Sequence, residues 1–483
     1  MTFGSGYRPD PRFIGLGSEF GDAVEAAKFP SHTLRWRDRR AAKCVGLDEL
    51  TDSEWLAHFG QFDALPNIGQ SPIAMRYHGH QFRSYNPQLG DGRGFLLGQV
   101  RDTTDRLLDF GTKGSGQTPW SRQGDGRLTL KGGVREILAA RMLEALGVNT
   151  SRALSLIETG ENLARNDEPS PTRSAVLVRL QHSHVRFGTF QRHAFLERPD
   201  NLTALVDHCV DCYYPHLLPL DGPNRVAAFV REVALATARM VAGWMAAGFV
   251  HGVLNTDNMN VTGQTFDYGP WRFLPHADAS FTAAYFDHQG LYAYGRQAEA
   301  GLWNLKQLAG ALTSICPVAG LTDAVRAYPP AFATAQLDAM CGRLGVMQGD
   351  NADQARAMLD AMFAFMARSG VSWDGFFHDW FGGIASQKRA LAGPRATLYQ
   401  GIEFETWYRA IGGFDSFRPD RVDLLYFGQP EPISLIIEKV ESLWEPIARD
   451  DDWTLFDAKI AGIEALGAVI KGVSSQTPAP KLT

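Results

Sequence analysis

The chain has 483 residues, of which 45% are hydrophobic and 21% are charged, a balance typical of globular proteins rather than of disordered or fibrous ones. Its net charge of −6 argues against a dedicated nucleic-acid-binding protein, because such proteins usually carry a basic surface. An uncharged apolar run of about 20 residues is missing from the sequence, so we expect neither a transmembrane helix nor a membrane partner.

The N-terminal residues lack a basic stretch followed by an apolar run, so we expect no secretory signal. The five cysteines are few and odd in number, which favours a reducing compartment over a disulfide-stapled exterior. Together these features predict a cytoplasmic protein.

The first 190 residues divide into two parts. Residues 1–72 are polar and aromatic and are expected to form an N-terminal extension, with one helix starting at Asp52. Residues 73–190 are expected to form a small lobe, because β-rich runs at 95–100, 107–110 and 175–178 alternate there with glycine turns. One amphipathic helix, 133–146, stands among these runs. The pattern predicts a mainly antiparallel sheet with a single helix.

Two glycine-rich loops in this lobe are candidate phosphate sites. The first contains Gly90, Gly92 and Arg93, and the second contains Asp125 and Gly126 just before the helix. Glycines let backbone N–H groups approach an anion closely, and a helix N-terminus favours negative charge. A plain turn remains the alternative for each loop.

Four charged side chains of the lobe predict a phosphate clamp. Lys113 stands at a strand end, and Glu136 on the following helix could orient it. Arg179 and Arg186 lie near a strand end, where their guanidinium groups could grip a terminal phosphate. The alternative is that all four are ordinary surface side chains.

The second half of the chain is mostly helical in pattern. Residues 191–400 are expected to form a large lobe, in which an apolar helix at 226–247 leads directly into His251. Further helical patterns occur at 301–312, 355–367 and 433–447. Residues 401–483 are expected to form a C-terminal helical region whose tail, from 474, is disordered.

The segment 251–258, which we call the catalytic loop, predicts a metal site and a base. Asn258 and Asp267 carry oxygen ligands suited to Mg²⁺ or Mn²⁺ bound jointly with nucleotide phosphates. A protein kinase places its catalytic Asp five residues before the metal-binding Asn, but Val253 stands there and cannot accept a proton. Asp257 is adjacent and could serve as base. An Asn/Asp turn is the alternative for the whole segment.

The order of these parts is that of a protein kinase active site, which predicts an α+β, kinase-like two-lobed fold. We expect a β-rich small lobe and a helical large lobe, with additional N- and C-terminal segments. The sequence Asp109-Phe110-Gly111 spells the kinase metal motif, but it precedes the lysine and is interpreted as strand. With Val253 in place of the base, the chain is either an inactive kinase or transfers something other than the γ-phosphoryl group.

The chain resembles the selenoprotein O (SelO, or YdiU) family of kinase-like protein adenylyltransferases. The similarity runs from about residue 76 to 275, is weaker to about 312, and is poor beyond about 400. It is carried by the segments 77–82, 87–94, 111–119, 124–127, 183–190, 251–259 and 267–270.

The resemblance implies that ATP binds flipped relative to kinases, with its α-phosphate toward the acceptor hydroxyl. Lys113, Arg179 and Arg186 would hold the buried phosphates, and Glu136 would pair with the lysine. Asn258 and Asp267 would hold the metal, Asp267 would also face the nucleotide, and Asp257 would accept the proton. The residues implied to line the nucleotide pocket are Gly90, Gly92, Arg93, Asp125 and Gly126.

The implied reaction transfers AMP from ATP to Ser, Thr or Tyr hydroxyls of protein substrates and releases pyrophosphate. Two other functions remain open from the residues alone. One is an ordinary phosphotransferase acting on protein or small-molecule hydroxyls. The other is a non-catalytic pseudokinase that binds nucleotide as a scaffold.

Overall fold

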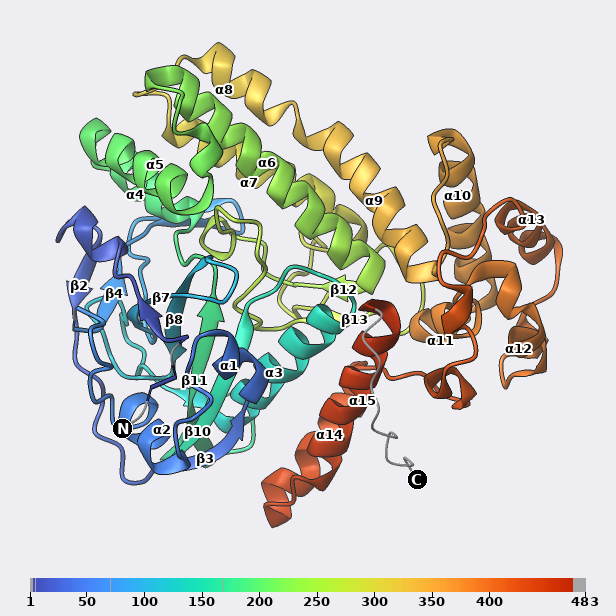
Figure 1. Ribbon diagram of the computed structural model, residues 1–483, viewed down its shortest axis with the longest axis horizontal. Coiled ribbons are helices and arrows are strands. Elements are labelled where there is room, and N and C mark those ends of the chain that lie inside the picture. Colours follow the sequence, from blue (N-terminus) through green and yellow to red (C-terminus); the bar gives the residue numbers. More distant parts are fainter. Residues whose placement is uncertain (1–2, 5, 70, 167, 472–483) are drawn as a thin grey trace.

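The computed structural model describes residues 3–4, 6–69, 71–166 and 168–471, and its architecture is α+β (Figure 1). A large antiparallel sheet occupies one end of the molecule and helices make up the rest. The predicted α+β class is confirmed, whereas the kinase-like two-lobed arrangement and the lobe boundaries stay predictions. The disordered tail predicted from residue 474 lies outside the described residues.

The sheet has the strand order β2-β4-β7-β8-β11-β10-β3, and β1 and β9 pair with β7 and β11. The strands predicted at 95–100, 107–110 and 175–178 correspond to β7, β8 and β11, shifted by a residue or extended. The segment predicted as an N-terminal extension supplies β1, β2 and β3 to the same sheet. The bounds are β1 Arg8–Pro9, β2 Gly21–Ala23, β3 Thr33–Arg37, β4 Ile73–Met75, β7 Leu96–Arg101, β8 Leu107–Lys113, β9 Leu128–Thr129, β10 Arg152–Leu163 and β11 Thr172–Gln181.

Smaller elements surround this sheet. The helix predicted to start at Asp52 is α2, and Thr51 caps it with Glu54 in a reciprocal capping box. A separate hairpin, β5–β6, packs against α4 and the short turn at 256–258. The bounds are α1 Arg39–Cys44, α2 Asp52–Phe59, β5 Gly79–Gln81, β6 Ser84–Asn86, β12 Phe249–Val250 and β13 Arg272–Phe273.

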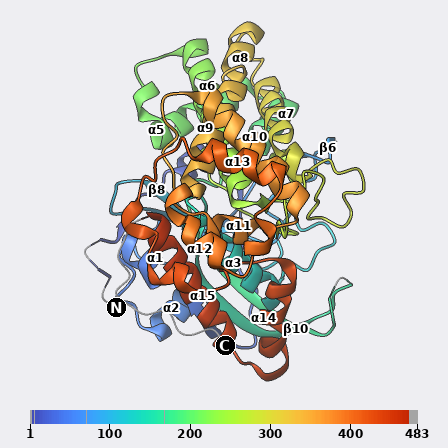
Figure 2. The same cartoon turned by 90° about the vertical axis from the view of Figure 1, so that its right-hand side faces the viewer.

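The predicted helix at 133–146 is α3 (Leu130–Ala145), which begins three residues earlier because Thr129 caps the backbone N–H of Gly132. It is buried on nearly all sides, since it packs on β10 and β11 and is covered by α15 (Thr454–Lys471). Lys131 also pairs with Glu441 on α14 (Ile437–Asp450) at 2.7 Å. Figure 2 shows α14 and α15 lying across α3, so the far end of the chain holds the helix that carries Glu136.

The predicted apolar helix at 226–247 is α6 (Gly222–Ala247), against which α7, α8 and α9 pack. Gly248 ends it in the left-handed conformation (φ +66°) and turns the chain toward His251. The patterns at 301–312 and 355–367 lie in α7 and α10, whereas the pattern at 433–447 becomes helical only at Ile437. The bounds are α4 Phe187–Phe195, α5 Pro199–Tyr213, α7 Gln297–Ala311, α8 Val318–Val325, α9 Tyr328–Leu344, α10 Ala352–Ser369, α11 Trp373–Asp379, α12 Gln387–Ala392 and α13 Ile402–Ile411.

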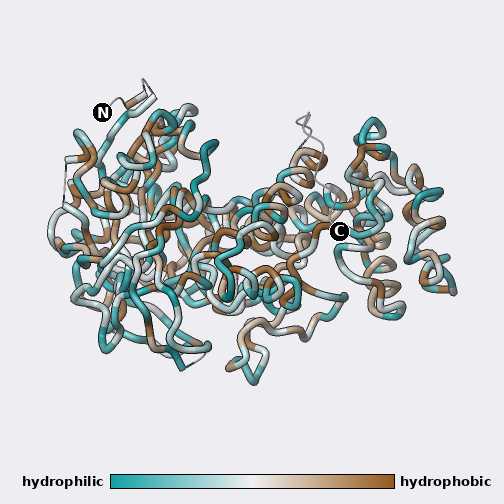
Figure 3. The backbone as a smooth tube through the Cα atoms, turned by 90° about the horizontal axis from the view of Figure 1, so that it is seen from below, coloured by the Kyte–Doolittle hydropathy of each residue, from teal (hydrophilic) through white to brown (hydrophobic). Residues whose placement is uncertain are grey.

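The outer helices α10–α13 share an apolar core of their own with the end of α9, rich in tryptophan and phenylalanine. Within the described ranges, each helix is too short or too polar to cross a membrane. In Figure 3 the hydrophobic stretches along the tube are accordingly brief and interrupted by hydrophilic ones.

We expect Leu466→Ala to lower the free energy of unfolding by about 2–5 kcal/mol, the usual result of emptying a buried leucine site. Leu466 is 3% exposed, in the core that α15 shares with α3. Leu455→Ala on the same helix is the control, because Leu455 is 46% exposed. Urea unfolding followed by circular dichroism measures both, and equal losses would mean that α15 does not pack as described.

Candidate active site

One face of β8 and β11 forms the floor of the site. Side chains alternate along a strand, so Asp109, Gly111 and Lys113 share a face of β8. Gly111 pairs directly with Arg179 on β11, which puts the arginine on that face too. Glycine is required at 111, since a Cβ there would lie 2.4 Å from His184 Nε2.

Asp109 has a structural role. This agrees with the interpretation of Asp109-Phe110-Gly111 as part of a strand rather than as the kinase metal motif. Its carboxylate accepts hydrogen bonds from the His184 backbone N–H and from Gln99 Nε2, both at 2.7 Å. It thereby fixes the start of the segment that carries Arg186.

Lys113 lies between two carboxylates in the buried interior. Its Nζ is 2.5 Å from Glu136 Oε1 and 2.7 Å from Asp267 Oδ1. The expected Lys113–Glu136 pair therefore forms, and Asp267 joins it. Burial by itself raises the pKa of a carboxyl group, but Lys113, Arg179 and Arg186 outweigh it and hold the pKa of Asp267 well below its ordinary value. Asp267 is thus ionised at neutral pH.

The backbone presents Asp267 in an uncommon conformation. Its φ of +62° lies in the left-handed region, which aspartate tolerates better than most residues. His251 Nε2 is 3.1 Å from the carbonyl oxygen of Phe266, and the His251 N–H donates to Gln297 Oε1 at 3.1 Å. His251, which was predicted only as the start of the loop and not as a site residue, therefore ties the catalytic loop to the Asp267 turn.

The two arginines differ in how firmly they are held. Arg186 donates to Asp91 Oδ1 at 3.1 Å and to the Asp257 carbonyl at 2.8 Å, and it lies 4.5 Å over the ring of Tyr77. Arg179 only approaches Asp267, at 3.8 Å, and its buried Nε and Nη1 have no hydrogen-bond partner among the described residues. Arg179 therefore has donors free for a ligand.

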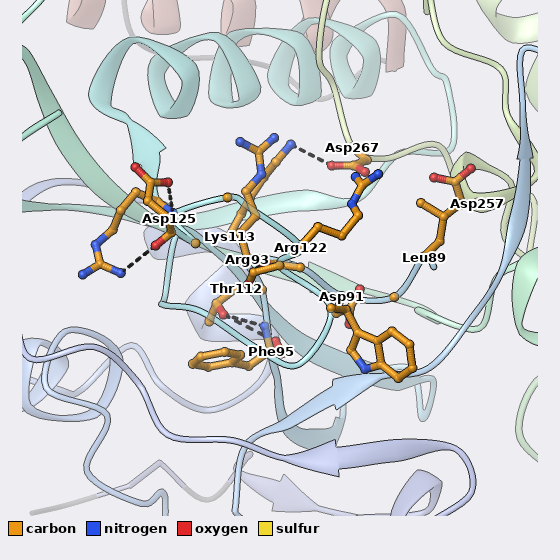
Figure 4. A pocket seen from close by; sticks show the side chains of 18 of the residues that line it. Leu89, Asp91, Arg93, Phe95, Thr112, Lys113, Arg122, Asp125, Asp257 and Asp267 are labelled. Carbon is orange, nitrogen blue, oxygen red and sulfur yellow. Dashed lines mark hydrogen bonds and ion pairs between the residues drawn. The ribbon is translucent and has the colours of Figure 1, made fainter. Parts of the chain in front are cut away.

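The surface alternative is wrong for all four clamp residues, because Lys113, Glu136, Arg179 and Arg186 are buried. Lys113, Arg179 and Arg186 border a cavity of about 760 Å³, a size common for small-molecule sites (Figure 4). Two expected site residues do not line the cavity themselves. Asn258 contacts Asp267, and Glu136 contacts Lys113. The expected site residues that line the cavity are Gly90, Gly92, Arg93, Lys113, Asp125, Gly126, Arg179, Arg186, Asp257 and Asp267.

The glycine-rich loops interlock as well as line the cavity. A Cβ on Gly90 would lie 2.3 Å from Cγ of Trp120, so the glycine makes room for the indole. Gly126 has φ +70°, and a Cβ there would lie 2.2 Å from the Gly116 carbonyl carbon. Packing between the loops is thus one reason for these glycines, in addition to any ligand.

Several cavity residues were not predicted from the sequence. Asp91, within the first loop, holds Arg186, and Arg122, before the second loop, lines the cavity. The available signal was the position of Asp91 between two glycines and that of Arg122 two residues before Gly124. Arg165 carries no such signal: it reaches back to Asp125, with its Nη1 2.8 Å from the carboxylate.

Asp257 is the uncommitted carboxylate of the site. It lies in a short 3-10 turn, Thr256–Asn258, and its buried Oδ1 accepts no hydrogen bond from the described residues. Burial raises its pKa to about 6, although Arg186 opposes the shift. In Figure 4 Asp257 and Asp125 lie at opposite sides of the view, with Lys113 and Asp267 between them.

Asn258 and Asp267 fit part of a divalent cation site. Asn258 Nδ2 donates to Asp267 Oδ2 at 3.3 Å, while the buried Asn258 Oδ1 has no partner among the described residues. Within the described ranges, His, Cys, Asp and Glu form no group of three or more that could hold a metal alone. Two hard oxygen ligands therefore suit a cation that nucleotide phosphates also coordinate.

Comparison with known proteins finds one family. A family model described as protein adenylyltransferase SelO matches residues 6–464, so the similarity extends well beyond the expected 76–312. A protein of Synechocystis sp. (strain ATCC 27184 / PCC 6803 / Kazusa), named protein nucleotidyltransferase YdiU, is 41% identical over 94% of this chain and 98% of its own. Proteins of the same name from Synechococcus elongatus and Gloeobacter violaceus are each 44% identical, over 93% and 92% of this chain and 93% of their own.

We expect Arg179→Ala to weaken ATP binding about 10- to 150-fold and AMP binding little, because each charge-assisted bond to a distal phosphate contributes about 1.5–3 kcal/mol. Arg186→Ala should follow the same pattern. Arg165→Ala is a matched control at the Asp125 end of the cavity and should affect both nucleotides alike. Titration calorimetry decides, and equal losses for ATP and AMP in Arg179→Ala would place this arginine away from the distal phosphates.

Proposed function

The chain belongs to the SelO family of protein adenylyltransferases, and we propose that it transfers AMP from ATP to Ser, Thr or Tyr hydroxyls of proteins. The proposal rests on one observation: Asp257, a half-buried residue whose Oδ1 has no partner among the described residues, shares a cavity with the cations of the clamp. Val253 occupies the kinase base position, so Asp257 is the candidate base of the catalytic loop. The name of the relatives states that a nucleotide is transferred to protein but does not say which nucleobase that nucleotide carries.

We propose a kinase-like arrangement for the chain as well. The sheet with α3 corresponds to a small lobe at 73–190, and the helices around α6 to a large lobe at 191–400. Residues 1–72 support the small lobe through β1, β2 and β3. Residues 401–483 support it through α14 and α15, which cover α3.

The nucleotide would lie with its distal phosphates deep in the cavity. Lys113, Arg179 and Arg186 would donate to the β- and γ-phosphate oxygens, and Glu136 would keep Lys113 in place. The α-phosphate would then face Asp257. The remaining lining, to which Gly90, Gly92, Arg93, Asp125 and Gly126 belong, would hold the rest of the nucleotide.

The acceptor hydroxyl oxygen would attack the α-phosphorus and form a new P–O bond. The bond from the α-phosphorus to the bridging oxygen of the β-phosphate would break, and pyrophosphate would leave. The hydroxyl proton would pass to the carboxylate of Asp257. A carboxyl group with a pKa of about 6 is mostly ionised at neutral pH, yet is a stronger base than an exposed aspartate.

Asn258 and Asp267 would hold Mg²⁺ or Mn²⁺, which offsets the negative charge of the phosphates. Asp267 would meanwhile keep its contact with Lys113, which orders the lysine for the nucleotide. The metal site and the phosphate clamp therefore share one carboxylate.

Separately labelled ATP tests the proposed reaction. We expect label from the α-phosphate, and none from the γ-phosphate, to become covalently attached to protein. Label from the γ-phosphate on an acceptor would indicate a phosphotransferase, and nucleotide binding without either label would indicate a scaffold. A parallel reaction with UTP labelled on the α-phosphate shows which nucleobase the enzyme prefers.

We expect Asp257→Ala to lower turnover about 10²- to 10⁴-fold, the usual contribution of a general base, with ATP affinity nearly retained. Asp257→Asn is the matched control of equal size and should lose activity similarly. Val253→Asp restores the kinase position, but we expect no γ-phosphoryl transfer, since the γ-phosphate would lie far from the acceptor. Phosphorylation by Val253→Asp would show that ATP binds in the kinase orientation.

A further inference from the structure

Exposed aromatic side chains gather beside the catalytic loop, at the tip of the β5–β6 hairpin. Phe82 at the tip is 37% exposed, and its ring lies 5.7 Å from that of Phe286, which is 43% exposed. Tyr285 is 82% exposed and lies 5.1 Å from Phe286. We call these three rings, Phe82, Tyr285 and Phe286, the aromatic platform. Contiguous exposed apolar surface of this kind marks interaction sites in proteins.

The hairpin half of the aromatic platform is fastened to the catalytic loop. The His80 N–H donates to Thr256 Oγ1 at 2.7 Å, and the Phe82 N–H donates to Asn255 Oδ1 at 3.0 Å. Thr256 in turn donates to Gln191 Oε1 at 2.6 Å, which anchors it to α4. The hairpin and the loop therefore hold a fixed relative position.

The ring of Phe82 rests on a residue tied to the same asparagine. Tyr292 donates its hydroxyl to Asn255 Oδ1 at 2.9 Å, and its buried ring lies 5.0 Å from Phe82. Asn255 stands two residues before Asp257, so their Cα atoms are within about 7 Å. Phe82, through which Phe286 joins the aromatic platform, consequently lies a short distance from the proposed base.

The backbone at the hairpin tip adopts a conformation that large side chains rarely take. Phe82 and Arg83 have φ of +48° and +65°, both left-handed. Two-residue hairpin turns of this type favour Asn-Gly, and bulky residues strain them. Arg83 forms an ion pair with Glu299 at 2.9 Å and lies over the ring of Trp303. Phe82 is the tip side chain that keeps an open face despite the strain.

We propose that the aromatic platform binds a large apolar or aromatic side chain of the protein substrate, within about three residues of the acceptor hydroxyl. The inference rests on the proposed function, because it assumes an acceptor hydroxyl at Asp257. An extended chain spans about 3.3 Å per residue, so two or three residues bridge from the base to the platform. Aromatic rings offer a large and rigid contact area to such a side chain.

Peptide libraries with a central Ser, Thr or Tyr and randomised flanks test this, with the full chain and ATP labelled on the α-phosphate. We expect Leu, Ile, Met, Phe and Trp to be enriched about tenfold over small polar residues at one position within three of the acceptor. Phe82→Gly and Phe286→Ala should reduce the enrichment to about twofold or less, while Phe82→Leu should retain it. Labelling without positional preference, a preference unchanged in Phe82→Gly, or labelling of proteins but of no peptide would overturn the proposal.

Two further measurements distinguish substrate binding by the aromatic platform from a purely structural role of Phe82. Phe82→Gly should unfold at the same or a higher urea concentration than the parent chain, because glycine adopts the positive φ freely. A variant that lost stability and kept the preference would show that Phe82 is structural, against the proposal. Tyr285→Phe keeps the ring and removes the hydroxyl, so the preference should persist. If label came from the γ-phosphate and the apolar preference were intact, the proposal of AMP transfer would be wrong. The proposal that the aromatic platform binds the substrate would still be supported.

Discussion

The contact of Lys113 with Glu136 and Asp267 is the interaction on which the site depends. Burying charges is unfavourable unless they are paired, and here three cations meet three carboxylates, because Asp91 also pairs with Arg186. The cluster is therefore close to neutral before a nucleotide enters. A triphosphate would add negative charge to a cluster whose cations are already paired with carboxylates. A divalent cation at the proposed ligands Asn258 and Asp267 would offset this added charge.

The placement of this cluster is a product of the whole chain. Lys113 and Arg179 come from neighbouring strands, and Glu136 comes from a helix that is buried between the sheet and α15. Asp267 comes from a turn that His251 ties to the catalytic loop. Strands from the first residues and helices from the last described residues both brace the same sheet and helix. The geometry therefore depends on segments far from the site in sequence.

The sequence predicted what depends on local pattern. The strand before Lys113, the helix of Glu136 and the apolar helix before His251 have periodic signals, and the loop motifs have fixed spacing. Contacts between distant segments have no such signal, so the Arg165–Asp125 pair, the cover of α15 on α3 and the strands β1–β3 were not predicted. Gly90 is instructive, because a glycine expected to face phosphate also accommodates Trp120. A local pattern indicates the backbone freedom of a residue but not the neighbour that makes use of it.

The packing of α15 on α3 also sets an order of events during protein synthesis. Arg141 on α3 pairs with Glu464 on α15, and 323 residues separate them. At about 5–20 residues per second, a ribosome needs roughly 15–65 seconds to make that stretch. During this time the helix that carries Glu136 lacks the cover that α15 gives it. A nascent chain therefore buries the helix behind its proposed nucleotide site only after α15 has been made.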